Sequence, residues 1–209
     1  MKIHDISMLL KKDTAEWPGD TPFQYQVNWS KEESGSVNVG KLVTSTHIGT
    51  HIDAPFHFDE NGEKVHELAL QNYLVQAVVI DVKGREKISR EDIEHIQIGR
   101  EKAVLFHTGS WNNRSLFPKE IPSFDLDIVE WMIDKGIILF GVDLPSVDAI
   151  TSKDLSMHHA LNRAGRYILE GLVLDKVKEG SYELIALPLN IEGADGSPVK
   201  AILIDRMST

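Results

Sequence analysis

The chain has 209 residues, a net charge of -10 at pH 7, 42% hydrophobic and 26% charged residues, and no cysteine. The negative charge argues against a nucleic-acid partner, because phosphate binding needs a basic surface, and the absence of cysteine excludes disulfides and cysteine-ligated zinc. No apolar run approaches the roughly 18 residues of a membrane helix, and the N-terminus lacks the layout of a signal peptide, so we expect a cytoplasmic protein with a small-molecule substrate and no membrane partner.

Short strand-like runs dominate the first half of the chain. Residues 17–20, Trp-Pro-Gly-Asp, have the composition of a tight turn that exposes its aromatic side chain. Residues 23–29 alternate with period two, which predicts a half-buried strand, and residues 37–45 are a second β-rich stretch.

Apolar runs alternate with helix signals in the second half. Ser89 opens one helix with a capping-box pattern, and a second helix is predicted to end at Gly136. This alternation predicts an α/β fold with a mixed sheet, and the even composition predicts a single domain over residues 1–209. The buried strands are predicted at residues 77–82, 103–107 and 137–142, the second and third helices at 125–135 and 152–162, and the last strands at 167–174, 182–187 and 199–204.

The main concentration of reactive side chains comprises His47, His51, Asp53 and His57, which are separated by even numbers of residues. In an extended chain such residues share one face, so we predict a bent, extended run with three imidazoles and a carboxylate on the same side. A helix fits less well because Pro55 disfavours it. Imidazole and carboxylate donors suit zinc, manganese or similar divalent ions. The alternative is that these histidines are ordinary surface or hydrogen-bonded residues.

Three further positions can contribute to such a site. Glu170 lies in an apolar run, and a buried carboxylate needs a partner or a metal, although an edge strand would leave it at the surface. His158 and His159 are adjacent in a predicted helix, so that only one faces a given site, and both can instead lie in solvent. Trp17 can stack on a flat substrate or simply pack on the domain.

The pattern His47-x-Gly-Thr-His51-x-Asp53-x-Pro-x-His57 resembles the signature of the cyclase-like metal-dependent hydrolases. The resemblance extends over essentially the whole chain, and segments outside the signature resemble the arylformamidase branch of that family. These segments are residues 17–23, 31–36, 141–148, 158–159 and 168–171.

The resemblance implies a swivelling β/β/α-type fold, with a mixed sheet flanked by helices, in a homodimer with two divalent metal ions per subunit, usually zinc. It implies that His47, His51 and Asp53 bind the first ion, and that Asp53 and Glu170 bridge to the second. One of the two adjacent histidines would complete that site, and we choose His158. His57 would be the general acid and base, and Trp17 would line the substrate pocket.

The implied reaction is the hydrolysis of N-formyl-L-kynurenine to L-kynurenine and formate. Two alternatives remain: a related hydrolase that opens a cyclic amide, as isatin hydrolases do, and a non-catalytic protein in which the metal only stabilises the fold. A serine-hydrolase mechanism is disfavoured because the chain has no Gly-x-Ser-x-Gly sequence.

Overall fold

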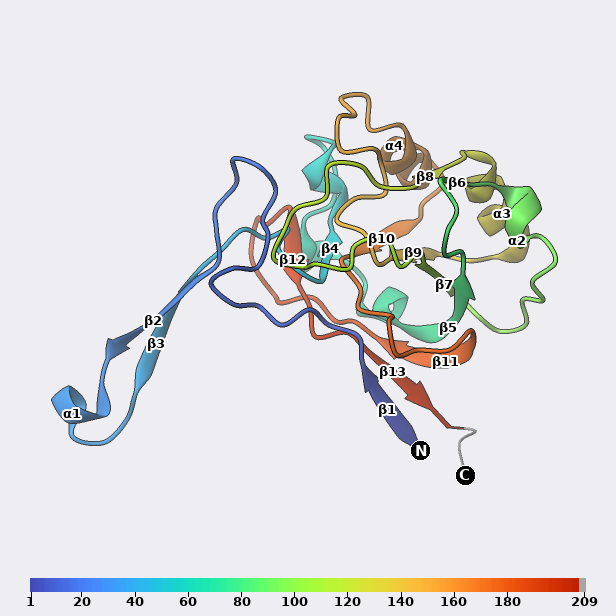
Figure 1. Cartoon of the computed structure of the whole chain (residues 1–209). Coiled ribbons are helices and arrows are strands. Elements are labelled where there is room, and N and C mark those ends of the chain that lie inside the picture. The colour runs from blue at the N-terminus through green and yellow to red at the C-terminus, as the bar shows by residue number, and fades with distance from the viewer. Residues whose placement is uncertain (207–209) are drawn as a thin grey trace.

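The computed structural model describes residues 1–206, and its central feature is a curled, nine-stranded mixed sheet (Figure 1). In spatial order its strands are β1 (Lys2–Asp5), β13 (Ile202–Asp205), β11 (Gly180–Ile185), β5 (Leu74–Asp81), β7 (Ala103–His107), β9 (Leu139–Val142), β10 (Tyr167–Glu170), β4 (His51–Asp53) and β12 (Gly196–Pro198). The mixed α/β fold predicted from the sequence is confirmed.

Strands β5, β7, β9 and β10 form the parallel centre of the sheet. All five residues of β7 and all four of β9 are buried, as expected for parallel strands that are covered on both faces. The apolar runs predicted as central strands are therefore confirmed. Outside this centre, β11 pairs antiparallel with β5, and β4 pairs antiparallel with β10.

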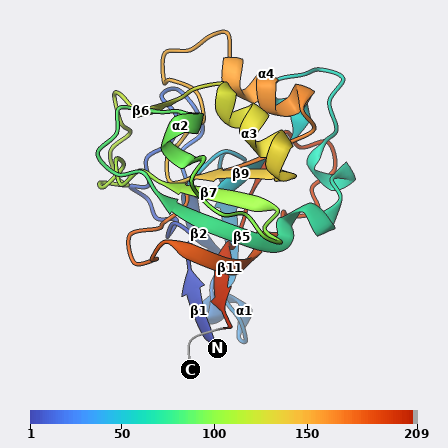
Figure 2. The ribbon, with the colours of Figure 1, turned by 90° about the vertical axis from the view of Figure 1, so that its right-hand side faces the viewer.

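Helices α2 (Arg90–Ile93), α3 (Asp127–Lys135) and α4 (Ser156–Arg163) lie on one face of the sheet (Figure 2). Ser89 forms the predicted capping box of α2, and Gly136 ends α3 in the left-handed conformation, with φ of 67°. None of the helices in the described part of the chain could span a membrane. Beside them lies the short parallel pair β6 (Lys87–Ile88) and β8 (Ser123–Phe124).

A second apolar core fills the opposite, concave face of the sheet. It is built from strand residues and from two of three short 3-10 helices, which contribute Val65 and Tyr73. These 3-10 helices are η1 (Pro55–His57), η2 (Val65–Glu67) and η3 (Leu70–Tyr73). Strand β10 contributes Ile168 to the first core and Leu169 to the second, and β4 packs on the second core through Ile52, so the strands that carry candidate site residues have little freedom to move.

A two-stranded arm, residues 24–43, projects away from the rest of the molecule (Figure 1). It consists of β2 (Gln24–Trp29), the single helical turn α1 (Lys31–Ser34) and β3 (Val39–Val43). Every residue of β2 and β3 is exposed. The strand predicted over residues 23–29 is therefore present, but the prediction that one of its faces is buried is wrong within the single chain. The alternation is present, but no other described part of the chain covers its apolar side.

Two predicted boundaries differ from the structure because of backbone conformation. The strand predicted over residues 167–174 stops at Glu170, because Gly171 turns the chain with φ of 66°. The helix predicted from residue 152 begins four residues later, after Leu155, which adopts φ of 43°. Such a backbone conformation is rare for residues other than glycine and interrupts helical geometry.

Candidate metal centre

The histidine–aspartate stretch does not form one extended run, contrary to the prediction. His47 lies in a turn, only His51–Asp53 is a strand, and His57 ends the 3-10 helix η1. The chain reverses at Gly49, which has φ of 64°. The four side chains nevertheless converge, because this turn and η1 fold back on β4 from its two ends.

Strand β4 lies between β10 and β12, and the register of both pairs fixes the candidate ligands. His51 is directly opposite Glu170 on β10, so both side chains share a face of the sheet. The edge-strand alternative for Glu170 is wrong, because β10 is internal and Glu170 is buried. Gly171 must lack a side chain, since a Cβ there would lie 1.9 Å from the carbonyl oxygen of Gly49.

Two groups of donor atoms share Asp53. In the first, Asp53 Oδ1 lies 2.9 Å from His47 Nδ1 and 3.5 Å from His51 Nε2. In the second, His158 Nε2 lies 3.5 Å from Asp53 Oδ2 and 3.7 Å from Glu170 Oε1. The groups are also joined by His51 Nε2, which lies 3.3 Å from Glu170 Oε2. Each group has three donors close enough together to hold one metal ion.

The shared carboxylate is almost completely inaccessible to solvent, and its Oδ2 atom has no hydrogen-bond partner. A buried polar atom without a partner is costly, and such an atom in a native structure calls for an explanation. The neighbouring donors are imidazole nitrogens and carboxylate oxygens, which are ligands for divalent cations. The unpaired Asp53 oxygen therefore fits a cation between Asp53, His158 and Glu170.

The electrostatics of the metal-free site are dominated by the two buried carboxylates. Burial alone would raise the pKa of Asp53, but the nearby imidazoles of His158 and His47 hold that pKa well below its usual range. Burial and the neighbouring Asp53 charge both raise the pKa of Glu170. Burial opposes charge on His47 and His158, but their carboxylate partners raise each imidazole pKa to about 10. Without a metal, protons on the imidazoles of His47 and His158 therefore supply the positive charge that balances the buried carboxylates. A bound cation would have to displace these protons.

His158 and His159 occupy different environments. The side chain of His158 is buried, and its Nδ1 atom lies 2.6 Å from Asp148 Oδ2, which also accepts from the His158 backbone N–H. His159 is partly exposed and packs edge-on against Phe58. The geometry thus brings His158, and not its neighbour, to the shared carboxylate. The sequence reasoning assigned no role to Asp148, which orients His158.

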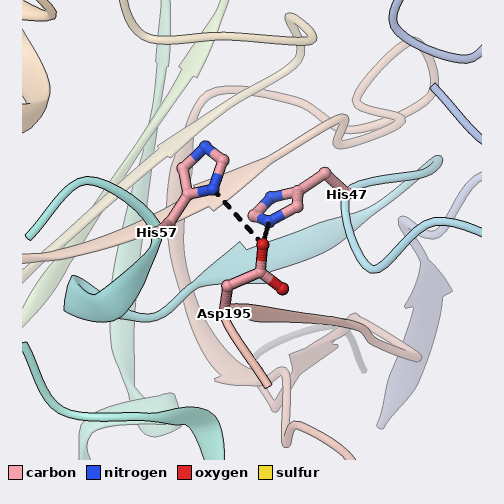
Figure 3. Close-up of side chains that lie close together, drawn as sticks. All are labelled: His47, His57 and Asp195. Atoms are coloured by element: carbon pink, nitrogen blue, oxygen red, sulfur yellow. Dashed lines mark hydrogen bonds and ion pairs between the residues drawn. The ribbon is translucent and has the colours of Figure 1, made fainter. Parts of the chain in front are cut away.

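His57 lies beside the first group rather than within it. Its ring centroid is 3.9 Å from that of His47, and its Nδ1 atom is 3.6 Å from Asp195 Oδ2 (Figure 3). Burial lowers the pKa of His57. Asp195 was missed by the sequence reasoning, because an aspartate before Gly196 reads as an ordinary turn residue.

The candidate site opens into a cavity of about 460 Å³. Trp17 lines this cavity together with the histidines, and its ring packs edge-on against Phe117 at a centroid distance of 5.1 Å. Residues 17–20 form the expected turn, closed by a hydrogen bond from the Asp20 N–H to the Trp17 carbonyl. The indole therefore both packs on the protein and presents a flat surface to the cavity.

Comparison with known proteins shows the family of the chain. A family model described as a putative cyclase matches residues 4–149. The chain is 52% identical over 199 residues to a kynurenine formamidase of Bacillus cereus (strain ZK / E33L), with 95% of each chain covered. It is 51% identical, with the same coverage, to a kynurenine formamidase of Geobacillus thermodenitrificans (strain NG80-2).

Solved structures agree with these sequence relationships. A potential metal-dependent hydrolase with cyclase activity superimposes with a TM-score of 0.83 at 26% identity, over 99% of both chains. Isatin hydrolase A from Ralstonia solanacearum superimposes with a TM-score of 0.79 at 25% identity, over 97% of this chain and 91% of that one. The chain belongs to the cyclase family of metal-dependent hydrolases.

Proposed function

We propose that this protein is an arylformamidase, which hydrolyses N-formyl-L-kynurenine to L-kynurenine and formate. The observation that carries the proposal is the pair of donor groups that share the buried, unpaired carboxylate of Asp53 beside an open cavity. The relatives at 52% and 51% identity over 95% of the chain bear the name of this activity. The cavity volume is in the range of small-molecule sites.

Two divalent ions, with zinc as the expected metal, are the proposed cofactors. His47, His51 and Asp53 would hold the first ion, and Asp53, His158 and Glu170 the second, in agreement with the two groups of donors. Nitrogen and carboxylate donors are ligands that zinc accepts. When bound, such ions supply an activated water and stabilise the negative charge that develops on the formyl oxygen.

The remaining steps are assigned to side chains of the cavity. His57 is placed to move a proton, because one side of its ring faces Asp195 while 35% of its side chain is exposed at the cavity. It would accept a proton from the attacking water and deliver it to the aniline nitrogen as the amide C–N bond breaks. Trp17 would stack on the aromatic ring of the substrate. Proton transfer would thus depend on His57 and substrate binding on Trp17, and both residues line the cavity.

Release of kynurenine from N-formyl-L-kynurenine, with and without a chelator, tests the proposal. We expect turnover that is lost on chelation and restored by added zinc, because the bound ions are proposed to supply the activated water. Circular dichroism of the chelated protein is the control. A chelated protein that stays folded and inactive agrees with catalysis, whereas one that unfolds and never shows turnover with any metal indicates a purely structural ion.

A cyclic-amide hydrolase is the second candidate, and the structural similarity to isatin hydrolase A supports it. Both reactions would use the same donor groups. Isatin is therefore assayed beside N-formyl-L-kynurenine under the same metal conditions. A higher kcat/KM for isatin would replace the arylformamidase assignment.

The projecting arm, residues 24–43, supports a homodimer. Tyr25 and Leu42 are cross-strand partners, and Val27 lies on the same face by alternation. These three side chains are 50–62% exposed. An isolated two-stranded ribbon is marginally stable in water, and a contiguous exposed apolar surface of this kind marks an interaction site. We propose that this face packs against a second copy of the chain.

Charges on the apolar face of the arm test the dimer. The double variant Val27→Asp/Leu42→Asp is expected to be monomeric in light scattering, because each carboxylate would be buried without a partner. The matched control is Gln24→Asp/Gln26→Asp, which adds the same charge to the opposite face of the arm and should remain dimeric. A monomeric wild-type protein, or a dimeric Val27→Asp/Leu42→Asp variant, would contradict the proposed interface.

A further inference from the structure

Asp195 contacts both His47, a proposed metal ligand, and His57, the proposed proton carrier. It precedes β12, and its backbone carbonyl accepts a hydrogen bond from the Ala54 N–H at 2.9 Å. The next residue, Gly196, pairs with Asp53 in the sheet. The backbone of Asp195 is therefore fixed to the strand that carries the shared carboxylate.

Both carboxylate oxygens of Asp195 are engaged within the site. Oδ1 accepts a hydrogen bond from the Thr46 hydroxyl at 2.8 Å. Oδ2 lies 3.0 Å from His47 Nε2 and 3.6 Å from His57 Nδ1 (Figure 3). One oxygen atom thus faces a nitrogen of each of the two stacked rings.

The local chain is shaped to hold this arrangement. A Cβ atom on Gly196 would lie 2.6 Å from His47 Cε1, so the imidazole can reach Asp195 only because this position has no side chain. The Thr46 hydroxyl holds the carboxylate from the other side. Asp195 is consequently oriented from two directions, which is not expected of an aspartate that only serves a turn.

Both ring nitrogens of His47 face a carboxylate, so a ligand role for Nδ1 requires the hydrogen of the ring to be on Nε2. His47 has Nδ1 directed at Asp53 and Nε2 at Asp195. A hydrogen on Nε2 that is donated to Asp195 leaves the Nδ1 lone pair available on the side of Asp53 and His51. A metal-ligating histidine normally donates its second N–H to such an acceptor, which fixes the tautomer and the orientation of the ring. For His57, the same carboxylate favours a hydrogen on Nδ1 and leaves Nε2 for exchange with a substrate.

We propose that Asp195 is a positioning residue that orients His47 toward the first metal and His57 toward the substrate. The inference rests on the proposed function of the site, in which these histidines are a ligand and a proton carrier. It links metal affinity and proton transfer through one carboxylate. Asp195 itself needs no contact with the substrate.

The variants Asp195→Asn and Asp195→Ala test this role, and Asp134→Asn is the matched control. Asp134 is exposed on α3 and pairs with Arg90 at 2.9 Å, far from the site in the fold. Metal affinity is measured by competition with a chelator, and kcat and KM are measured at saturating zinc. We expect each Asp195 variant to stay folded, to lose about 10- to 100-fold in metal affinity, and to lose kcat at little change in KM.

A double-mutant cycle isolates the effect on His57. In the His57→Ala background, Asp195→Asn should not lower kcat further at saturating zinc, because the ring that Asp195 orients is absent. A further loss of the same size as in the wild-type background would overturn the orienting role toward His57. Unchanged metal affinity in both single variants would overturn the role toward His47.

Metal stoichiometry separates a positioning residue from a ligand. His47, His57 and Asp195 are themselves close enough to hold an ion. If Asp195→Asn loses one full metal equivalent at saturating zinc, Asp195 is a ligand and the proposal is overturned. The affinity measurement needs no substrate, so it remains informative if the wild-type protein fails to hydrolyse N-formyl-L-kynurenine, which would reject the proposed function alone.

Discussion

Asp53→Ala is expected to lose bound metal at both donor groups and to lose turnover with it. Asp53 is the only residue that the two groups share, so its removal takes one oxygen from each. Residues that merely orient a ligand change metal affinity by about 10- to 100-fold, and loss of a shared ligand should exceed the upper end of that range. The effect on activity should be equally large, because the ions are proposed to activate the attacking water.

Elemental analysis after dialysis, together with the formamidase assay, measures this result. Asp53→Asn is the second variant, because it keeps the volume of the side chain and removes only the charge. Asp134→Ala on α3 serves as the control for handling and dialysis, and should retain the wild-type metal content. Thermal unfolding identifies a variant that is merely misfolded. Unchanged metal content in a folded Asp53→Ala protein would rule out the proposed shared ligand.

The centre of the fold was predictable because its signals are local. Residues 103–107 are a continuous apolar run with a helix signal on either side, and they form β7 as predicted. The end of α3 was predictable from Gly136 for the same reason, since a left-handed C-terminal residue favours glycine. Local patterns of this kind need no knowledge of what packs against them.

The arm and the backbone of the site were not predictable in this way. Alternation over residues 23–29 predicts a strand correctly, but it cannot tell whether another chain or this one covers the apolar side. In the site, even spacing from His47 to His57 suggested one extended face, whereas the structure uses a turn, a short strand and a 3-10 helix. The side chains converge because the chain turns at Gly49, and glycine alone does not reveal the direction of such a turn.

Site residues that lie far from the histidine–aspartate stretch in the sequence were also hard to predict. Glu170 could be singled out because a carboxylate within an apolar run is costly to bury. Asp195 lies 148 residues from His47 in the sequence, and reaches it only through the pairing of β12 with β4. No periodicity or composition marks such a residue. Its role follows from sheet register, which a single sequence does not specify.

His57→Ala is expected to keep its metal and lose most of its turnover. The ring of His57 stacks on that of His47 at a centroid distance of 3.9 Å, and His57 belongs to neither donor group that contains Asp53. Removal of a general acid or base typically costs about 10²- to 10⁴-fold in rate. We therefore expect a fall in kcat of this size, while zinc content stays at the wild-type level.

Added imidazole provides a positive test of the same role. The His57 side chain is 35% exposed at the cavity, so the space left by its removal is accessible to a small molecule. Imidazole should restore part of the turnover of His57→Ala, but none of the turnover of Asp53→Ala, which lacks a ligand rather than a proton carrier. Full activity of a zinc-loaded His57→Ala protein would remove His57 from the mechanism. A loss of zinc in this variant would instead make His57 a ligand, and would assign the proton transfer to another group in the cavity.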